Sequence, residues 1–131
     1  MGYESRIYVV DKHEGLHCPS DKKLWGEVLS MMNLSKWSSV AEFFSRKPVT
    51  DCYIYSDDGN TAIIDDRYGK ELTECSIDEF YDFLMGVSSE EDCLSNDDRN
   101  YLRYLPLLKL IEGYKLSKDR YENLAILHYG Y

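Results

Sequence analysis

The alternation of apolar and polar positions at the start of the chain predicts a strand, a loop and a second strand. Residues 3–10, YESRIYVV, are rich in β-branched and aromatic residues and alternate between two faces, as a strand does. Residues 11–23 predict a loop because Gly15 and Pro19 interrupt any regular element. Residues 25–36, WGEVLSMMNLSK, lack the apolar stripe of an amphipathic helix. We therefore expect a second strand there, with a helix as the alternative.

Two strand-like segments in the middle of the chain predict a β-hairpin. They are CYIYS and NTAIID, and residues 57–60, Asp-Asp-Gly-Asn, lie between them. Asp-Gly favours a tight turn because glycine readily adopts the positive φ that such turns require. DDRYGK, residues 65–70, predicts a second turn, and ELTEC, residues 71–75, predicts a further short strand.

Capping residues mark the start of two helices. Ser38 or Ser39 can cap a short helix over SVAEFFSR, which Pro48 closes. Ser76 and Glu79 match a capping box, in which each side chain satisfies a backbone amide of the other residue. The helix that follows has four apolar residues on one face: Ile77, Phe80, Phe83 and Leu84.

The last third predicts a more apolar helix and a final strand. Pro106 predicts a kink or a late start in the helix over residues 99–114, and Gly113 predicts its end. NLAILHY, residues 123–129, predicts the last strand. Together these elements predict one α+β domain over residues 1–131. Two to three helices would pack on one face of a mainly antiparallel sheet of about five strands.

Composition favours a soluble cytoplasmic protein. Hydrophobic residues make up 44% of the 131 residues, and no run approaches the ~20 apolar residues that span a bilayer. The first 15 residues contain charges and no long apolar core, unlike a signal peptide. Cys18, Cys52, Cys75 and Cys93 show no C-x-x-C spacing, so we expect reduced thiols, with Cys52 and Cys75 buried.

The net charge of −9 is concentrated in the middle of the chain. Residues 51–98 have 15 acidic residues against only Arg67 and Lys70, a net charge of −13. The segments before and after it carry +1 and +3. Such a field repels nucleic acid and anionic membranes and attracts basic protein surfaces.

The acidic pairs Asp57–Asp58 and Asp65–Asp66 do not predict a metal site. In an EF-hand loop counted from Asp57, Gly59 and Tyr68 would occupy the third and twelfth positions, which require oxygen ligands. A site shared by the two pairs would need both turns at one end of the sheet, whereas successive turns of a meander lie at opposite ends. We interpret these residues as turn residues whose charge is also used.

Neither of the remaining histidine patterns predicts a catalytic or zinc site. His13, Glu14 and His17 match H-E-x-x-H, but Gly15 places them in the predicted loop and no third ligand is apparent. His128, in the last predicted strand, could act as a base, but no nucleophile can be paired with it. The chain has no P-loop, G-x-G-x-x-G or G-x-S-x-G motif. We expect no enzymatic activity, no cofactor and no metal.

Three stretches resemble a known family. MGYESRIYVV, DCYIYSDDGNTAIIDDRYGKELTE and LAILHYGY resemble small proteins from phages and prophages of gut Firmicutes. The likeness spans most of the chain, although WGEVLSMMNLSKW matches the family's second strand only loosely. The resemblance implies a viral accessory protein in the host cytoplasm, and it assigns no catalytic residue. Small acidic phage proteins of that kind are often inhibitors of host defence nucleases, including anti-CRISPR proteins and anti-restriction DNA mimics.

These observations lead to the hypothesis of an anti-defence, anti-CRISPR-like inhibitor. An acidic face that imitates nucleic acid would bind a basic surface of a host nuclease, and the protein would bind neither nucleic acid nor membrane directly. Tyr68 would serve as an aromatic anchor. The residues expected to bind the partner are Asp57, Asp58, Asp65, Asp66, Tyr68, Glu90, Glu91, Asp92, Asp97 and Asp98.

Two alternatives stay open. One is a sponge that binds a signalling nucleotide, for which the last third supplies basic residues: Arg99, Arg103, Lys109, Lys115, Lys118 and Arg120. The other is a phage accessory protein without a role in defence.

Overall fold

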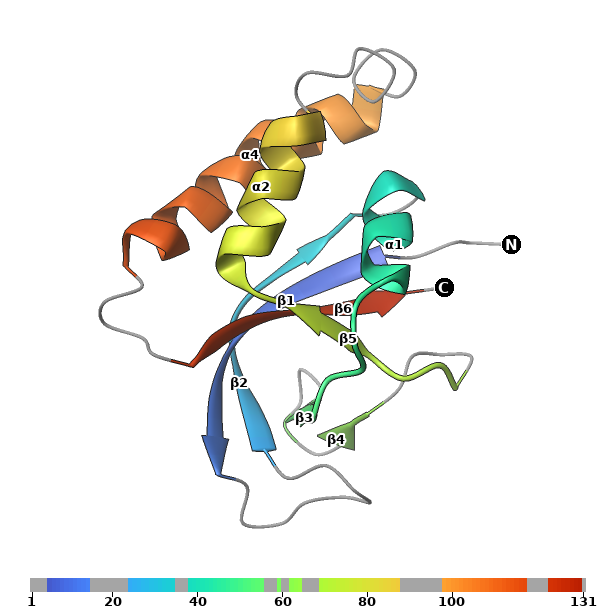
Figure 1. Ribbon diagram of the computed structural model, residues 1–131, viewed down its shortest axis with the longest axis vertical. Helices are drawn as coiled ribbons and strands as arrows, with labels where there is room; N and C mark the ends of the chain where they lie inside the picture. Colours follow the sequence, from blue (N-terminus) through green and yellow to red (C-terminus); the bar gives the residue numbers. More distant parts are fainter. Residues whose placement is uncertain are drawn as a thin grey trace.

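The structure of the protein, a computed structural model, describes residues 5–14, 24–34, 38–55, 59, 62–64, 69–87, 98–117 and 123–130. Strands and helices follow one another in the predicted order, and the α+β class is confirmed (Figure 1). The elements are β1 (Ser5–Glu14), β2 (Leu24–Asn33), α1 (Ser38–Ser45), β3 (Cys52–Tyr55), β4 (Ala62–Ile63), β5 (Thr73–Cys75), α2 (Ile77–Val87), α4 (Asp98–Leu116) and β6 (Leu124–Gly130).

The sheet has six strands in the order β4-β3-β2-β1-β6-β5, and it is mixed. This corrects the prediction of about five mainly antiparallel strands. β1 pairs antiparallel with β2 and β6, but β2 and β3 run parallel, with Leu24 opposite Cys52 and Trp25 opposite Tyr53. The cause is α1, because a helix that connects two neighbouring strands brings the chain back in the same direction.

The sheet curls until the chain before β3 reaches the opposite edge strand, β5. Val49 forms a bridge with Thr73. The Thr50 amide donates to the Leu72 carbonyl at 2.9 Å, and the Glu74 amide donates to the Pro48 carbonyl at 3.0 Å. These bonds satisfy backbone groups of an edge strand that would otherwise stay unpaired.

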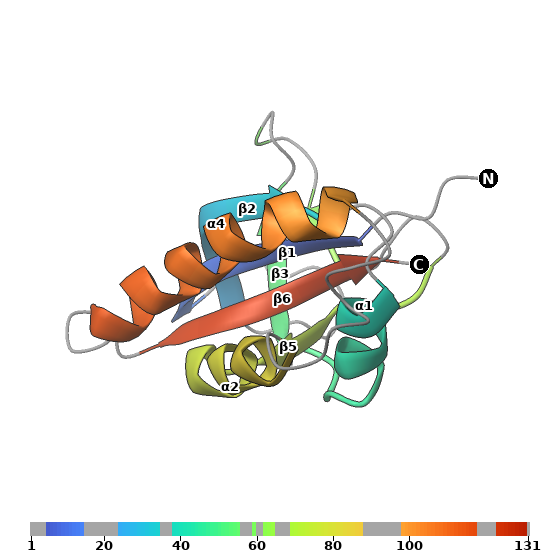
Figure 2. The same cartoon turned by 90° about the horizontal axis from the view of Figure 1, so that it is seen from above.

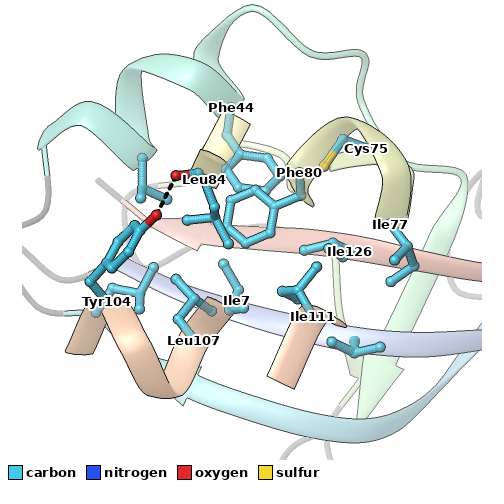
Figure 3. Packing of buried hydrophobic residues seen from close by; sticks show 13 residues of the cluster. Ile7, Phe44, Cys75, Ile77, Phe80, Leu84, Tyr104, Leu107, Ile111 and Ile126 are labelled. Carbon is cyan, nitrogen blue, oxygen red and sulfur yellow. Dashed lines mark hydrogen bonds between the residues drawn. The ribbon is translucent and has the colours of Figure 1, made fainter. Parts of the chain in front are cut away.

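The three described helices pack on one face of the sheet around one buried cluster (Figure 3). Phe44 of α1 and Phe80 of α2 meet Ile7 and Ile126 of the central strands there, and all four are fully buried. Burying one such side chain contributes about 1.5–3 kcal/mol. Seen from above, α4 lies over β1, whereas α1 and α2 lie toward β5 (Figure 2). The apolar face predicted for α2 is confirmed.

The inner face of the curled sheet encloses a second buried cluster. Alternation along β1 places Ile7 and Val9 toward the helices and Tyr8 and Val10 toward this cluster. A Cβ added to Gly26 would lie 3.2 Å from Ile54 and 3.3 Å from Val10, so glycine permits the close approach of β2. The cluster consists of Tyr8, Val10, Cys52, Ile54, Leu72, Ala125 and Leu127.

Each of the two predicted turns contains a glycine with positive φ, and the capping box predicted for α2 is confirmed. Gly59 has φ of +74° between the antiparallel strands β3 and β4, and Gly69 has φ of +79° at the second predicted turn. The Glu79 amide donates to Ser76 Oγ at 3.1 Å, and the Ser76 amide donates to Glu79 Oε1 at 3.3 Å. This reciprocal pair is the predicted capping box at the start of α2.

Helix α4 departs from its predicted limits. It passes through Pro106, which is exposed, and it continues beyond Gly113 to Leu116. The extension is stabilised by tertiary contacts, since the Tyr114 hydroxyl lies 2.6 Å from Ser30 Oγ and Lys115 lies over the Tyr81 ring. Among the described helices, none is both long and apolar enough to cross a membrane.

Candidate functional site

The residues predicted to bind a partner fall almost entirely outside the described part of the chain. Only Asp98 lies within it, as the first residue of α4. The other predicted residues are Asp57, Asp58, Asp65, Asp66, Tyr68, Glu90, Glu91, Asp92 and Asp97. By their place in the chain they lie between β3 and β5 or between α2 and α4. The hypothesis requires these residues to share one face.

Ion pairs connect the acidic middle block, residues 51–98, to bases from the rest of the fold. Lys12 of β1 binds both Asp51 and Glu74, at 3.2 and 2.7 Å. The other described pairs that cross the edge of the block are Lys47–Glu79 at 2.6 Å and Lys115–Asp78 at 3.7 Å. Four acids of the block, Asp51, Glu74, Asp78 and Glu79, are therefore engaged within the fold.

Lys12 is the centre of a polar network at the closure of the sheet. Its side chain is only 20% exposed, and Thr50 Oγ1 donates a second hydrogen bond, at 2.7 Å, to the Glu74 carboxylate. Burial opposes the charged ammonium, but the hydrogen bond and charge of Glu74 outweigh it and raise the pKa of Lys12. Burial likewise opposes the charged form of Asp51, but Lys12 lowers its pKa overall.

The bases proposed for a nucleotide site are partly engaged by acids. Lys109 Nζ lies 3.4 Å from Glu112 Oε1. Lys115 lies near Asp78 and 4.2 Å from the centre of the Tyr81 ring. Phosphate recognition needs cationic groups that can turn to the ligand. These contacts weigh against the nucleotide-binding alternative at the described residues of α4.

His128 has a buried partner that the sequence did not reveal. Its Nε2 lies 2.6 Å from Ser5 Oγ, and its ring stacks on Phe44 with the ring centres 4.8 Å apart. A serine nucleophile must be reached by substrate, but Ser5 has no exposed surface. We interpret this contact as one that satisfies a buried hydroxyl, because an unpaired one would cost about 1–3 kcal/mol.

A cleft of about 550 Å³ separates α1 from α2. Phe43 and Phe83 stack in it with ring centres 4.4 Å apart, and Lys47 lies over the Phe43 ring. Its basic residues are paired: Arg46 with Glu42 at 2.9 Å and Lys47 with Glu79. The cleft therefore offers an aromatic surface with largely balanced charge, which is unlike a phosphate site.

Cys52 and Cys75 are buried, as predicted, and both are free thiols. Burial raises the pKa of Cys52 to about 11, and burial also raises the pKa of Cys75. Because the thiolate is the reactive and metal-binding form, neither thiol is set up as a nucleophile.

Strand β1 extends through Glu14, so His13 lies in a strand and not in the predicted loop. The extension is stabilised by pairing with β2, which polar side chains do not prevent. Side chains alternate along a strand, so Glu14 points away from His13. H-E-x-x-H zinc sites require a helix, whereas here His13 Nε2 lies 2.9 Å from Glu27 Oε1 and 3.4 Å from Asp11 Oδ2. His17 lies outside the described residues.

The chain matches no protein-family model, no curated protein and no solved structure. Function is therefore inferred from the residues themselves and from their geometry.

Proposed function

We propose that the protein is an anti-defence inhibitor that binds a basic protein surface, the nucleic-acid groove of a bacterial defence nuclease. The observation that supports this is the excess of 15 acidic residues over two bases in residues 51–98. Basic grooves hold counterions that are released when phosphates bind, and carboxylates on a folded scaffold can use the same gain in free energy.

Part of the acidic block has a structural role within the fold. Lys12, Lys47 and Lys115 engage acids of the block that lie beside the sheet and α2. The acids proposed for the partner belong to residues 57–66 and 90–98. Binding through them would steer association by charge and depend strongly on salt.

A pull-down with the tagged protein tests the proposal. We expect a defence nuclease to be retained from bacterial lysate at low salt and lost at high salt. Reversal of Asp57, Asp58, Asp65 and Asp66 to lysine should abolish retention while the circular dichroism spectrum and melting temperature stay unchanged. Tight binding by that folded variant would contradict the proposal.

Two double variants distinguish an effect of the position of the charges from an effect of net charge alone. Asp65→Lys/Asp66→Lys and Glu14→Lys/Glu42→Lys change the net charge equally, but Glu14 and Glu42 lie outside the block and are exposed. Only the first variant should weaken binding. Equal weakening would indicate a nonspecific charge effect, and stabilisation of the protein by a cyclic nucleotide would support the sponge alternative instead.

A further inference from the structure

Asp11, His13 and Glu27 form a compact group of potential metal ligands on the β1–β2 pair. Asp11 and His13 are two residues apart in β1 and therefore project to the same face. Glu27 lies directly opposite Asp11 in the register of the two strands. One ligand atom from each of the three side chains lies within 4.8 Å of the others. The paired backbones thus hold three donors around one point.

We propose that Asp11, His13 and Glu27 bind a divalent transition-metal ion. One imidazole nitrogen and two carboxylate oxygens suit Zn²⁺, Mn²⁺ or Fe²⁺, whereas Ca²⁺ and Mg²⁺ prefer oxygen donors alone. Metal–donor distances of about 2.0–2.2 Å place neighbouring donors somewhat more than 3 Å apart. The separations of His13 Nε2 from the two carboxylates, 2.9 and 3.4 Å, are close to that spacing.

In the described part of the chain, the carboxylates of the group are not neutralised by a nearby lysine or arginine side chain, which favours binding of a cation. Within the described ranges, no lysine or arginine forms an ion pair with Asp11 or Glu27. The adjacent Lys12 is engaged by Asp51 and Glu74. With no metal bound, a proton on His13 Nε2 can bridge the carboxylates.

The group is open to solvent on one side. His13 and Glu27 are 41% and 46% exposed, so an ion can enter and keep coordination positions for water or another ligand. A cleft of about 320 Å³ lined by Trp25 and Glu27 adjoins it. The Trp25 ring lies 5.3 Å from the His13 ring, close enough to report a bound paramagnetic ion. This site does not depend on the proposed function.

Calorimetric titration with Zn²⁺ and Mn²⁺ tests the site, in a background where Cys18 and Cys93 are serine so that these thiols cannot bind the metal. We expect one ion per chain. His13→Ala, Asp11→Asn and Glu27→Gln should each weaken binding at least about tenfold, the scale on which even outer-shell changes act. Circular dichroism of the metal-free variants checks that they fold.

Two control variants and a second readout make the test decisive. Glu14→Gln removes a carboxylate from the opposite face, and His17→Ala removes the second histidine of the H-E-x-x-H pattern. Neither should change the affinity. In a Trp37→Phe background, Co²⁺ should quench Trp25 fluorescence, and His13→Ala should remove the quenching. Absence of binding, or binding that His13→Ala leaves unchanged, would overturn the proposal, as would equal losses in the controls.

Discussion

The Lys12 ammonium lies 2.7 Å from the Glu74 carboxylate, and this ion pair joins β1 to the edge strand β5. The same ammonium reaches Asp51, directly before β3, so one cation connects three parts of the sheet. It does so where residues 48–50 pair with β5 and the sheet curls toward closure. The acidic block is therefore both a charge excess and a structural part of the fold.

Replacement of Lys12 by methionine should destabilise the protein by about 1–2 kcal/mol. The substitution leaves Glu74 and Asp51 without their cation, and the loss of a partly buried charged hydrogen bond is of that size. Urea denaturation measures the change. Lys109→Met is the matched control because its pair with Glu112 is exposed, and it should cost less than about 0.5 kcal/mol. Equal effects would contradict the central position of Lys12.

Stability should fall at both ends of the pH range. The pKa values of Asp51 and Glu79 are lowered, the first by Lys12 against the effect of burial and the second by Lys47 and the Ser76 amide. The stabilisation that these two carboxylates give to the folded state is present above the ordinary carboxyl pKa of about 4. It is lost as the pH falls through their lowered pKa values.

On the alkaline side, the pKa values of Lys12 and Cys52 are raised in the folded protein, that of Cys52 to about 11. The stabilisation that these two protonated groups give to the folded state is complete below their ordinary pKa values. It is lost as the pH rises toward their raised pKa values. Urea midpoints between pH 3 and 11 should thus form a plateau with losses on both sides. Lys12→Met should reduce the loss on the acidic side, because Asp51 then lacks its cation, and an unchanged acidic profile would contradict the assignment.

Two glycine-to-alanine substitutions should have opposite effects. Gly26→Ala forces a Cβ to within 3.2–3.4 Å of Ile54, Val10 and Tyr53 and should destabilise the sheet by about 1–3 kcal/mol. Gly113→Ala adds a Cβ that meets no neighbour within 4 Å, in a helix interior. It should stabilise the protein by about 0.5–1 kcal/mol. Thermal unfolding of both variants checks the packing of β2 and the continuation of α4.

The thiols of Cys52 and Cys75 should react slowly in the folded state. Both are buried, and burial raises both pKa values. In a Cys18→Ser/Cys93→Ser background, a disulfide reagent at pH 8 should modify the two thiols only as fast as the protein unfolds. Rapid modification of the native protein would show that one of them is accessible.

The sequence predicted those features that neighbouring residues determine. The Ser76–Glu79 capping box and the positive φ of Gly59 each depend on a few adjacent positions, and both are present. The end of α4 could not be predicted locally, because a contact between Tyr114 and Ser30 favours helix beyond Gly113.

Features that depend on strand pairing were missed. Ser5 meets His128 across 123 positions of sequence, and only the pairing of β1 with β6 brings them together. Asp11 and Glu27 meet through the β1–β2 register, which the polar composition of residues 11–14 concealed. One feature of the sequence does indicate the parallel pair of β2 and β3, namely the helix predicted between them.

The most direct measurement is the affinity for the purified nuclease retained in the pull-down, determined at several salt concentrations with and without its nucleic-acid substrate. We predict that log Kd rises linearly with log salt and that the substrate displaces the protein. The slope should be lower in the Asp65→Lys/Asp66→Lys variant. An affinity independent of salt, with substrate bound at the same time, would contradict binding through a nucleic-acid groove.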